Sequence, residues 1–457
     1  MPRSKNIAIY GLGKEGFAAA VYFAKEDAVT VIEDRPEKEI GQETVAKLKG
    51  LGVEIFFAGK LPKNRHFDFV VRSPGVRPDN QNLQDLVKAG SRSTTSTDIF
   101  FNRCPAPVIG VTGTKGKGTT STLIYSILKL AKKDAYLAGN IGTPMLEILP
   151  KLSLKSIVVL ELSSFQLMDL KKSPHIAVVL MVTSEHLDWH KDQSEYQKAK
   201  LPIVANQKSG DFAVINYDFP ASASFAKYTK ANVVTFSTLS NKTQVFASNG
   251  TIISKMAGRE ETVMETADVK LPGKHNLQNI TAAVAVALIM KIPTEVIKDA
   301  VNSFSGLPHR LELVGKINGV SYYNDSFSTT PETSIAAIRA FPQPKILILG
   351  GSSKKSDFTD LAKTISSEKS VKAIILVGDE SETIKGELSK HNVNVPILDG
   401  AQNMYEIISQ TGKFSSPGDV VLLSPACASF GMFKNYMDRG EQFRGEVKKL
   451  RESASGS

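Results

Sequence analysis

Short runs of apolar residues, separated by stretches with helical spacing, recur along most of the chain. Runs of roughly four to eight such residues that are rich in valine and isoleucine are typical of strands buried on both faces. They lie at residues 7–10, 29–33, 67–75, 107–111, 156–164, 176–182, 319–325, 345–350, 373–378 and 419–424. Because these strands alternate with helices, the pattern predicts an α/β fold with mainly parallel sheets that helices cover on both faces.

Two breaks in the pattern predict three domains. Cys104-Pro-Ala-Pro107 interrupts the chain before one strand, and Phe304-Ser-Gly-Leu-Pro308 interrupts it again. A chain of 457 residues also exceeds what one hydrophobic core usually serves. We therefore expect domains at residues 1–104, 105–305 and 306–457. Within the second, residues 212–270 are richer in β-branched and polar residues and predict sheet edges and hairpins, and a long helix follows to Met290.

The stretch Val108–Leu123 combines a predicted strand, a glycine-rich turn and the start of a helix. Backbone N–H groups of such a turn can surround phosphate oxygens, and the helix N-terminus and Lys117 add positive charge. The strict pattern G-x-x-x-x-G-K-[ST] is not met, because Val111 replaces its first glycine and Gly118 follows the lysine. A hydroxyl for magnesium must then come from Thr119 or Thr120. An ordinary loop is the alternative, but the flanking strand and helix favour a phosphate site.

A second glycine pattern opens the chain. Gly11, Gly13 and Gly16 follow a predicted strand in G-x-G-x-x-G spacing, and the acidic pair Glu33 and Asp34 comes about twenty residues later. This arrangement fits a dinucleotide site, so a nicotinamide-dependent dehydrogenase is one hypothesis. The pattern itself indicates only a phosphorylated ligand at a helix N-terminus, which a nucleotide sugar satisfies equally.

Two buried strands of the second domain end in groups that suit a metal. Glu161 ends one apolar run, and His186 follows the next, within Thr-Ser-Glu-His-Leu-Asp-Trp-His190. We expect these strands to be neighbours and to deliver both side chains to the sheet edge that carries the glycine-rich turn, where they could hold magnesium against phosphates. His186 and His190 have the spacing of a zinc helix, but the H-E-x-x-H glutamate is missing, which argues against zinc. Asn276 and Asn279 share a helix face and suit either an adenine edge or a helix cap.

Composition narrows the class of partner. The net charge of +10 would suit nucleic acid, but the basic residues are dispersed and are not interleaved with aromatic residues. We therefore expect no nucleic-acid partner and assign the excess charge to anionic small substrates. The two cysteines lie far apart, and no signal peptide or long apolar span is present, which predicts a cytoplasmic protein without a membrane partner.

Taken together, ordered blocks between Gly11 and Phe443 resemble the Mur ligase family of ATP-dependent amide-forming enzymes. Each block is weak evidence alone, but their order along the chain is specific. The blocks are Gly-Leu-Gly13, Ser-Pro-Gly75, Gly-Thr-Lys-Gly-Lys117, Gly-Asn-Ile-Gly142, Glu-Leu-Ser-Ser-Phe-Gln166, Glu-His-Leu-Asp188, His-Asn276, Pro-His-Arg310, Asn-Asp-Ser326 and Ser-Pro-Ala-Cys-Ala-Ser429.

The resemblance implies a Rossmann-like N-terminal domain for a uridine nucleotide sugar, a central P-loop ATPase-like domain with a parallel sheet, and a Rossmann-like C-terminal domain for an amino acid. It is strongest to members that join D-glutamate to UDP-N-acetylmuramoyl-L-alanine through an acyl phosphate in peptidoglycan precursor synthesis. Such an enzyme uses ATP and Mg²⁺, and we expect a monomer. The implied nucleotide-sugar contacts are Gly13, Glu33, Arg35, Ser73, Gly75 and Asn140.

The resemblance also implies the ATP, metal and catalytic groups. Lys117, His186 and Lys200 would be catalytic, and Lys200 matches a family lysine that becomes carbamylated. Magnesium would be held by Thr119 or Thr120, Glu161, His186 and the modified Lys200. The implied ATP contacts are Thr114, Lys115, Gly116, Lys117, Gly118, Thr119, Thr120, Asn276, Asn279, Arg310 and Asp325.

One departure concerns the incoming amino acid. Thr329, Lys354, Ser429 and Tyr436 match or approximate the family's contact positions, but Phe327 stands where the D-glutamate-adding members carry lysine. A cation expected near the incoming carboxylates is therefore missing. An acidic amino acid remains the expected substrate, and Lys355 is one residue that could supply the charge.

Four other functions compete with this one. Folylpolyglutamate synthase shares the Gly-Lys-Gly phosphate loop, but the N-terminal glycines and Ser-Pro-Ala-Cys-Ala-Ser429 disfavour it. A Mur-like or folylpolyglutamate-type ligase that adds an amino acid other than D-glutamate is another alternative. A nicotinamide-dependent dehydrogenase is supported by residues 11–34 alone, and a non-catalytic nucleotide-binding module would not need Glu161 and His186.

Overall fold

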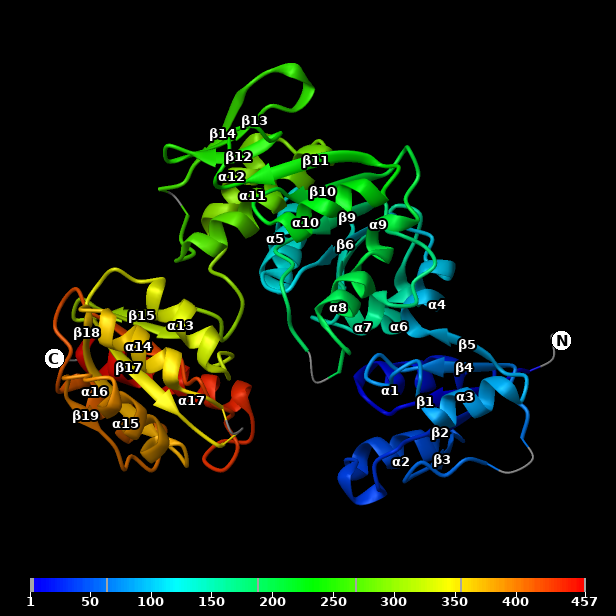
Figure 1. Cartoon of the computed structure of the whole chain (residues 1–457), viewed down its shortest axis with the longest axis horizontal. Coiled ribbons are helices and arrows are strands. Elements are labelled where there is room, and N and C mark those ends of the chain that lie inside the picture. The colour runs from blue at the N-terminus through cyan, green and yellow to red at the C-terminus, as the bar shows by residue number, and fades with distance from the viewer. Residues whose placement is uncertain (1–3, 63–64, 187–188, 268, 354–355, 456–457) are drawn as a thin grey trace. The chain divides into compact units, whose positions relative to one another are not determined.

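The structure is a computed structural model that describes residues 4–62, 65–186, 189–267, 269–353 and 356–455. These residues form three sheets, one in each predicted domain, and helices alternate with the strands (Figure 1). The α/β fold predicted from the sequence is therefore confirmed. The described residues cluster in two compact units, one containing those of 1–267 and 277–301 and the other those of 268–276 and 302–457.

The N-terminal sheet is parallel throughout. The apolar runs near residues 7, 29 and 69 are its inner strands, as predicted. Its strands, in spatial order, are β3 (Glu54–Phe56), β2 (Ala28–Ile32), β1 (Asn6–Tyr10), β4 (Phe69–Arg72) and β5 (Arg92–Thr95). The helices that accompany it are α1 (Lys14–Phe23), α2 (Gln42–Gly50), α3 (Gln81–Lys88) and α4 (Ser96–Arg103).

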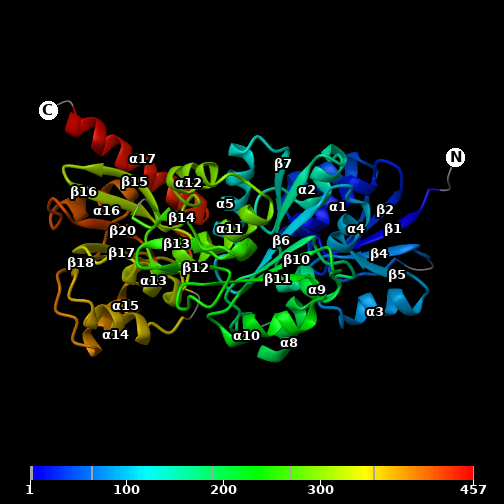
Figure 2. The same cartoon turned by 90° about the horizontal axis from the view of Figure 1, so that it is seen from above.

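The central sheet is mixed. Its body is parallel, and β12, β13 and β14 pair antiparallel at one edge, where hairpins were predicted (Figure 2). Its strands, in spatial order, are β14 (Glu261–Glu265), β13 (Thr251–Ser254), β12 (Val245–Ser248), β11 (Asn232–Ser237), β10 (Phe212–Asn216), β9 (Ile176–Val179), β6 (Val108–Thr112), β8 (Ile157–Glu161) and β7 (Ala135–Gly139). Its helices are α5 (Lys117–Leu130), α6 (Met145–Ile148), α7 (Ser164–Leu167), α8 (Gln193–Lys200), α9 (Pro202–Ala205), α10 (Pro220–Ala223), α11 (Lys274–Ile289) and α12 (Thr294–Ser303).

One expectation about this sheet is wrong. Glu161 and His186 follow β8 and β9, which are not neighbours, because β6 lies between them and pairs with both. The glycine-rich turn after β6 is therefore flanked by the two strands that carry the expected metal ligands. Sequence order gave no sign that the earlier strand would lie between the two later ones.

The C-terminal sheet has helices on both faces. Apolar side chains of α13, α14 and α15 pack on one face, and those of α16 and α17 pack on the other. The sheet is parallel except for the antiparallel pair β15 and β16. Its strands, in spatial order, are β15 (Glu312–Ile317), β16 (Val320–Asn324), β20 (Val420–Leu423), β17 (Lys345–Gly350), β18 (Val371–Val377) and β19 (Ile397–Leu398). The helices are α13 (Pro331–Arg339), α14 (Thr359–Ser367), α15 (Ser381–Lys390), α16 (Met404–Gly412) and α17 (Tyr436–Ser455).

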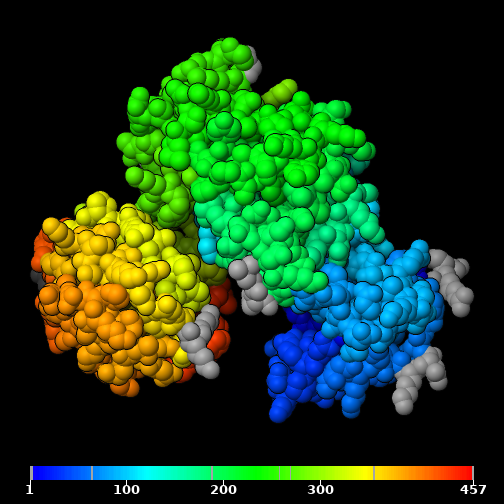
Figure 3. Space-filling view, in the orientation of Figure 1, coloured from blue at the N-terminus to red at the C-terminus, as the bar shows by residue number. Residues whose placement is uncertain are grey.

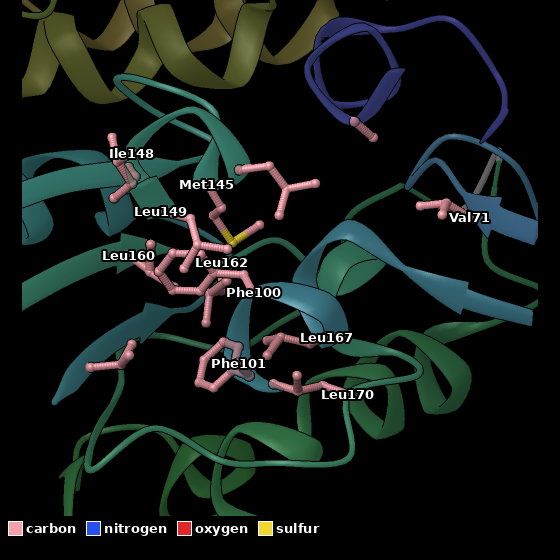
Figure 4. Close-up of a cluster of buried hydrophobic side chains, with 14 of the residues drawn as sticks. Val71, Phe100, Phe101, Met145, Ile148, Leu149, Leu160, Leu162, Leu167 and Leu170 are labelled. Atoms are coloured by element: carbon pink, nitrogen blue, oxygen red, sulfur yellow. The ribbon is translucent and has the colours of Figure 1, made fainter. Parts of the chain in front are cut away.

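One hydrophobic cluster joins the N-terminal and central sheets. Phe100 and Phe101 of α4 lie among Leu160, Leu162 and Leu167 of the central domain (Figure 4). Polar contacts add to this packing, since Arg72 donates to Asp169 at 2.6 Å. In the space-filling view the blue and cyan-green surfaces of these two sheets are contiguous (Figure 3). The two sheets therefore belong to one packed unit.

The domain limits at residues 104 and 305 remain predictions. No helix within the described residues has the length and apolar character needed to cross a membrane.

Candidate functional site

Each sheet has two neighbouring strands after which the polypeptide turns in opposite directions at the carboxyl edge of the sheet. Ligands of open α/β sheets bind at such a switch point. In the N-terminal sheet, β1 leads to α1 on one face and β4 leads to α3 on the other. In the central sheet, β6 continues toward β7 and β9 continues toward β10, on opposite sides. In the C-terminal sheet, β17 leads to α14 and β20 leads to α17, again on opposite faces.

A cleft of about 680 Å³ lies at the N-terminal switch point. Glu33 organises one wall, since its carboxylate accepts from Leu12 N–H at 2.6 Å and from the Arg35 guanidinium at 2.9 Å. Burial opposes ionisation of Glu33, but these bonds outweigh it and lower the pKa of the carboxyl. The cleft is lined by each of the predicted nucleotide-sugar residues, namely Gly13, Glu33, Arg35, Ser73, Gly75 and Asn140.

The two glycine-containing turns meet at the floor of this cleft. Ser73 Oγ donates to Gly11 O at 2.6 Å, which ties the turn after β4 to the turn after β1. A Cβ at Gly13 or Gly75 would meet no atom within 4 Å, so both positions face open space. The turns can therefore bring backbone groups against a ligand without a side chain in between.

The glycine-rich turn after β6 has the form expected of a phosphate loop. Gly116 has φ of +87°, which favours glycine, and α5 begins at the next residue, Lys117. The Lys117 ammonium donates to Gly113 O at 3.0 Å and to Thr114 O at 2.9 Å. Lys115 is more exposed and pairs with Glu185 at 2.5 Å. The turn thus carries two cations at a helix N-terminus, as a phosphate site requires.

Hydroxyl groups behind the turn fix its shape. Thr114 Oγ1 accepts from Thr183 N–H at 2.9 Å and from the Tyr196 hydroxyl at 3.1 Å. The two candidate magnesium hydroxyls differ. Thr119 is half-buried, whereas Thr120 is fully buried and its Oγ1 has no hydrogen-bond partner among the described residues. Gly118, which stands between Lys117 and Thr119 in the first turn of α5, is also buried.

Glu161 connects the nucleotide-sugar cleft with the phosphate loop. The carboxylate is 4 % exposed and accepts from the Asn140 amide at 2.6 Å. Asn140 also lines the N-terminal cleft. Glu161 pairs in register with Val111, just before the loop. One amide therefore contacts both the cleft and the carboxylate that was predicted to hold a metal.

Lys200 lies under the phosphate loop. It is 1 % exposed, and its ammonium lies 3.2 Å from Gly113 O and 4.5 Å from the centre of the Tyr196 ring. Burial, and then the charge of Lys117, lower the pKa of Lys200 well below its usual value, although Glu185 and Glu161 oppose this. The Lys200 ammonium therefore loses its proton more readily than a lysine in water does.

The two histidines of the predicted metal segment pack against the same aromatic ring but differ in exposure. The His186 side chain is 46 % exposed, and its ring lies 5.0 Å from the Phe165 ring. The His190 side chain is buried, its ring stacks on Phe165 at 5.5 Å, and its Nε2 lies 2.9 Å from Ser164 Oγ. Leu187 and Asp188 of this motif lie outside the described residues.

No three His, Cys, Asp or Glu side chains gather into a metal cage within the part of the chain that the structure describes. Mg²⁺ in nucleotide sites keeps several waters and takes one or two carboxylates together with substrate phosphates. The buried Glu161 carboxylate beside the phosphate loop suits that donor set.

Helix α11 carries the two predicted amide contacts. Asn276 and Asn279 are both buried, at 6 % exposure. The Asn276 amide donates to Pro272 O at 2.7 Å, so it closes the turn before the helix. A Cβ at Gly116 would collide with Asn279 Oδ1, which places Asn279 directly against the phosphate loop.

In the second unit, Asp325 is fixed at the end of β16. Its carboxylate accepts from Ser424 Oγ at 2.8 Å and from Leu311 N–H at 3.1 Å. Burial raises the pKa of Asp325 to about 6, against the effect of these bonds and of Arg310. Arg310 lies within Coulombic reach, with its guanidinium over the Phe327 ring. Arg310 and Asp325, two of the predicted ATP residues of this unit, are thus neighbours.

Of the predicted amino-acid residues, Thr329 lies on the loop after β16, Ser429 lies on the loop after β20, and Tyr436 is the first residue of α17. Ser429 is buried and Thr329 and Tyr436 are half-buried. Tyr436 packs edge to face on Phe327, with ring centres 5.0 Å apart. Lys354 and Lys355 lie outside the described residues.

Several residues that line or support these sites were missed from the sequence. Trp189 is the chain's one tryptophan, and it lines the N-terminal cleft with its indole N–H donating to Gly75 O at 3.1 Å. Arg77 lies over the same ring at 4.9 Å. Arg439 is buried and donates to Ser326 Oγ at 2.9 Å, and burial lowers the pKa of its guanidinium to about 10. The rarity of tryptophan was the only signal that sequence offered for any of them.

Comparison with known proteins agrees with this geometry. Residues 111–287 match the family model described as the Mur ligase middle domain, and residues 309–427 match the one described as the Mur ligase, glutamate ligase domain. Among curated relatives, UDP-N-acetylmuramoylalanine–D-glutamate ligase of Symbiobacterium thermophilum is 35% identical over 97% of this chain and 98% of its own length. The enzyme of the same name from Acetivibrio thermocellus is 35% identical over 97% of this chain and 96% of its own.

A solved structure supports the fold. UDP-N-acetylmuramate-alanine ligase of Thermotoga maritima superposes with a TM-score of 0.61 at 18% identity, covering 98% of this chain and 100% of its own. The family models and the full-length relatives lead to one assignment. The chain belongs to the Mur ligase family of ATP-dependent amide-forming enzymes.

Proposed function

We propose that this protein joins D-glutamate to UDP-N-acetylmuramoyl-L-alanine, with ATP and Mg²⁺, in peptidoglycan precursor synthesis. The names of the full-length relatives support this substrate pair. The contact made by Asn140 carries the proposal. Because Asn140 lines the N-terminal cleft and donates to Glu161, a nucleotide sugar in that cleft would end beside the phosphate loop. The proposal includes a monomeric enzyme that acts in the cytoplasm.

The proposed chemistry follows from charge. A carboxylate is a poor acyl donor, so the alanyl carboxylate of the sugar nucleotide attacks the γ-phosphorus of ATP and ADP leaves. The product is an acyl phosphate. The amine of D-glutamate then attacks the acyl carbon, phosphate leaves from the tetrahedral intermediate, and the amine gives up a proton. Positive groups placed around the γ-phosphate stabilise the negative charge that spreads over its oxygens.

The residues of the central domain divide this work. Lys117 and the backbone N–H groups of residues 114–120 bind the phosphates. Bound magnesium would neutralise phosphate charge, and its holders would be Glu161, His186, Thr119 or Thr120, and Lys200 if it is carbamylated. Thr119 is the better hydroxyl donor of the pair, because it is less buried than Thr120.

The other predicted contacts complete the proposal. Asn276, Asn279, Arg310 and Asp325 are proposed as ATP contacts on the strength of the resemblance and of their burial or pairing. Thr329, Ser429 and Tyr436, with Lys354, are proposed as contacts of the incoming amino acid. Switch-point loops in the C-terminal sheet support that location.

The test of the proposal is ADP release by the full-length protein. We expect release with ATP, Mg²⁺ and UDP-N-acetylmuramoyl-L-alanine to accelerate when D-glutamate is added, and to respond less to L-glutamate, D-aspartate, glycine or L-lysine. A faster response to another amino acid would refute the assignment of D-glutamate. Release that needs no sugar nucleotide would refute the ligase itself.

A further prediction concerns the N-terminal cleft. Replacing Glu33 by glutamine should raise the KM for the sugar nucleotide by about 10-fold to 100-fold, because charge-assisted bonds to Arg35 and the Leu12 turn weaken. The KM for ATP should stay unchanged. Initial-rate kinetics measure both constants. Glu37→Gln, on an exposed carboxylate of the same segment that pairs with Lys49 at 3.5 Å, is the control. If Glu33→Gln raised the KM for ATP instead, the nucleotide-sugar assignment of this cleft would be wrong.

A further inference from the structure

Arg310 makes an unusually close contact with Phe327. The guanidinium carbon lies 3.7 Å from the centre of the ring, and this is the shortest cation–π contact found in the described residues. Such contacts stabilise a cation out to roughly 6 Å from the ring centre. Phe327 is the position at which the family resemblance expects a lysine. The uncharged Phe327 ring is therefore covered by the positively charged Arg310 guanidinium.

The backbone places Arg310 there. His309 and Leu311, which flank it, have φ of 62° and 45°, a left-handed conformation that is unfavourable for residues with a side chain. Two hydrogen bonds hold this turn against the loop after β16. Phe327 N–H donates to His309 O at 3.0 Å, and Leu311 N–H donates to Asp325 Oδ1 at 3.1 Å. The Arg310 side chain therefore leaves a strained turn that is pinned on both sides to the loop that carries Phe327.

The ring of Phe327 is itself held in place. Tyr436 packs against it edge to face, at 5.0 Å and an interplanar angle of 88°. Tyr436 is fixed in turn, because its carbonyl accepts from Ser326 Oγ at 2.8 Å at the start of α17. Phe327 remains 38 % exposed, so it adds little to the hydrophobic core. An exposed ring with a fixed orientation fits a role in positioning a neighbour better than a role in folding.

We propose that Phe327 is a positioning residue that holds the Arg310 guanidinium over its ring and so orients it for nucleotide binding. This inference rests on the proposed function, which gives Arg310 a contact with ATP. The Phe327 ring then serves nucleotide binding through Arg310 and makes no polar contact with the amino acid. Other side chains of the C-terminal loops then determine specificity for the amino acid.

A double-mutant cycle on the full-length protein tests this coupling. The Kd of a non-hydrolysable ATP analogue with Mg²⁺ is measured by calorimetry for wild type, Phe327→Leu, Arg310→Lys and the double variant. We expect Phe327→Leu to weaken binding by about 5-fold to 30-fold, as the loss of a cation–π contact of this kind implies. In the Arg310→Lys background the same change should cost less than about twofold, because lysine cannot stack as guanidinium does. Phe327→Tyr, which keeps the ring face, should bind the analogue nearly as wild type does.

The controls separate this inference from the proposed function. Tyr405→Leu removes an exposed ring from α16 in the same unit and should leave the Kd unchanged. Equal effects of Phe327→Leu with and without Arg310, or no effect at all, would overturn the inference alone. A Phe327→Lys variant with a lower KM for D-glutamate and an unchanged Kd for the analogue would also overturn it, since position 327 would then serve the amino acid. A wild-type chain that fails to bind the analogue would overturn the proposed function and the inference together.

Discussion

Replacing Lys117 by alanine is expected to lower kcat by about 10²-fold to 10³-fold, the usual cost of removing one group that stabilises transition-state charge. In the structure the Lys117 ammonium is held by two carbonyl oxygens of its own turn, Gly113 O and Thr114 O. These two bonds hold the ammonium at the glycine-rich turn. Loss of this cation should slow transfer of the γ-phosphoryl group more than it weakens ATP binding, because negative charge spreads during that step.

Single-turnover ADP formation at saturating ATP measures this effect. Lys129→Ala is the matched control, since Lys129 is an exposed lysine on the same helix, α5. Thermal unfolding of both variants shows whether the fold is retained, because Lys117→Ala also loses the two bonds to the turn. A folded Lys117→Ala variant with a nearly normal rate would show that the γ-phosphate lies elsewhere.

The sequence predicted the elements of the fold better than their arrangement. Apolar runs located the inner strands of the N-terminal and C-terminal sheets, and β6, β8 and β9 of the central sheet, because burial on both faces leaves a continuous signal. Residues 212–270 were predicted as sheet edges and hairpins, but β10 and β11 of that stretch lie inside the sheet. The sequence pattern missed β3, β5, β7, β15 and β19. It also made β8 and β9 neighbours, whereas β6 lies between them. Order along the chain does not fix order in a sheet when a crossover can pass over a strand.

In the candidate site, likewise, the sequence predicted individual turns better than the contacts between distant segments. Glycine spacing located the turns at Gly11 and Gly116 because both residues have a positive φ, which favours glycine. Contacts between distant segments had no such signal. Asn140 donates to Glu161 across 21 positions of sequence, and Trp189 reaches Gly75 across 114. Pairings of this kind depend on the tertiary fold, so spacing alone could not reveal that one amide touches both ligand sites.

Lys200 is the other residue with a large expected effect. Its amine is buried, lies 3.2 Å from Gly113 O, and has a pKa that burial and the charge of Lys117 lower. A neutral amine can add to CO₂ and release a proton, which converts the side chain into a carbamate anion. Lys200→Arg keeps a cation but cannot form this anion. We therefore expect Lys200→Arg and Lys200→Ala each to lose at least about 10²-fold in kcat, consistent with the cost of disturbing a metal's supporting groups.

Two measurements separate a carbamate from a structural lysine. Protein equilibrated with ¹³C-bicarbonate should give a carbamate carbon resonance that is absent from Lys200→Arg, and small carboxylates such as acetate should partly restore the activity of Lys200→Ala. Lys198→Ala is the control, because Lys198 is exposed on the same helix, α8. If Lys200→Arg were fully active, a cation at this position would be sufficient and the carbamate would have no role. The pair of substitutions thus tests the sign of the charge beneath the phosphate loop, on which the proposed metal site depends.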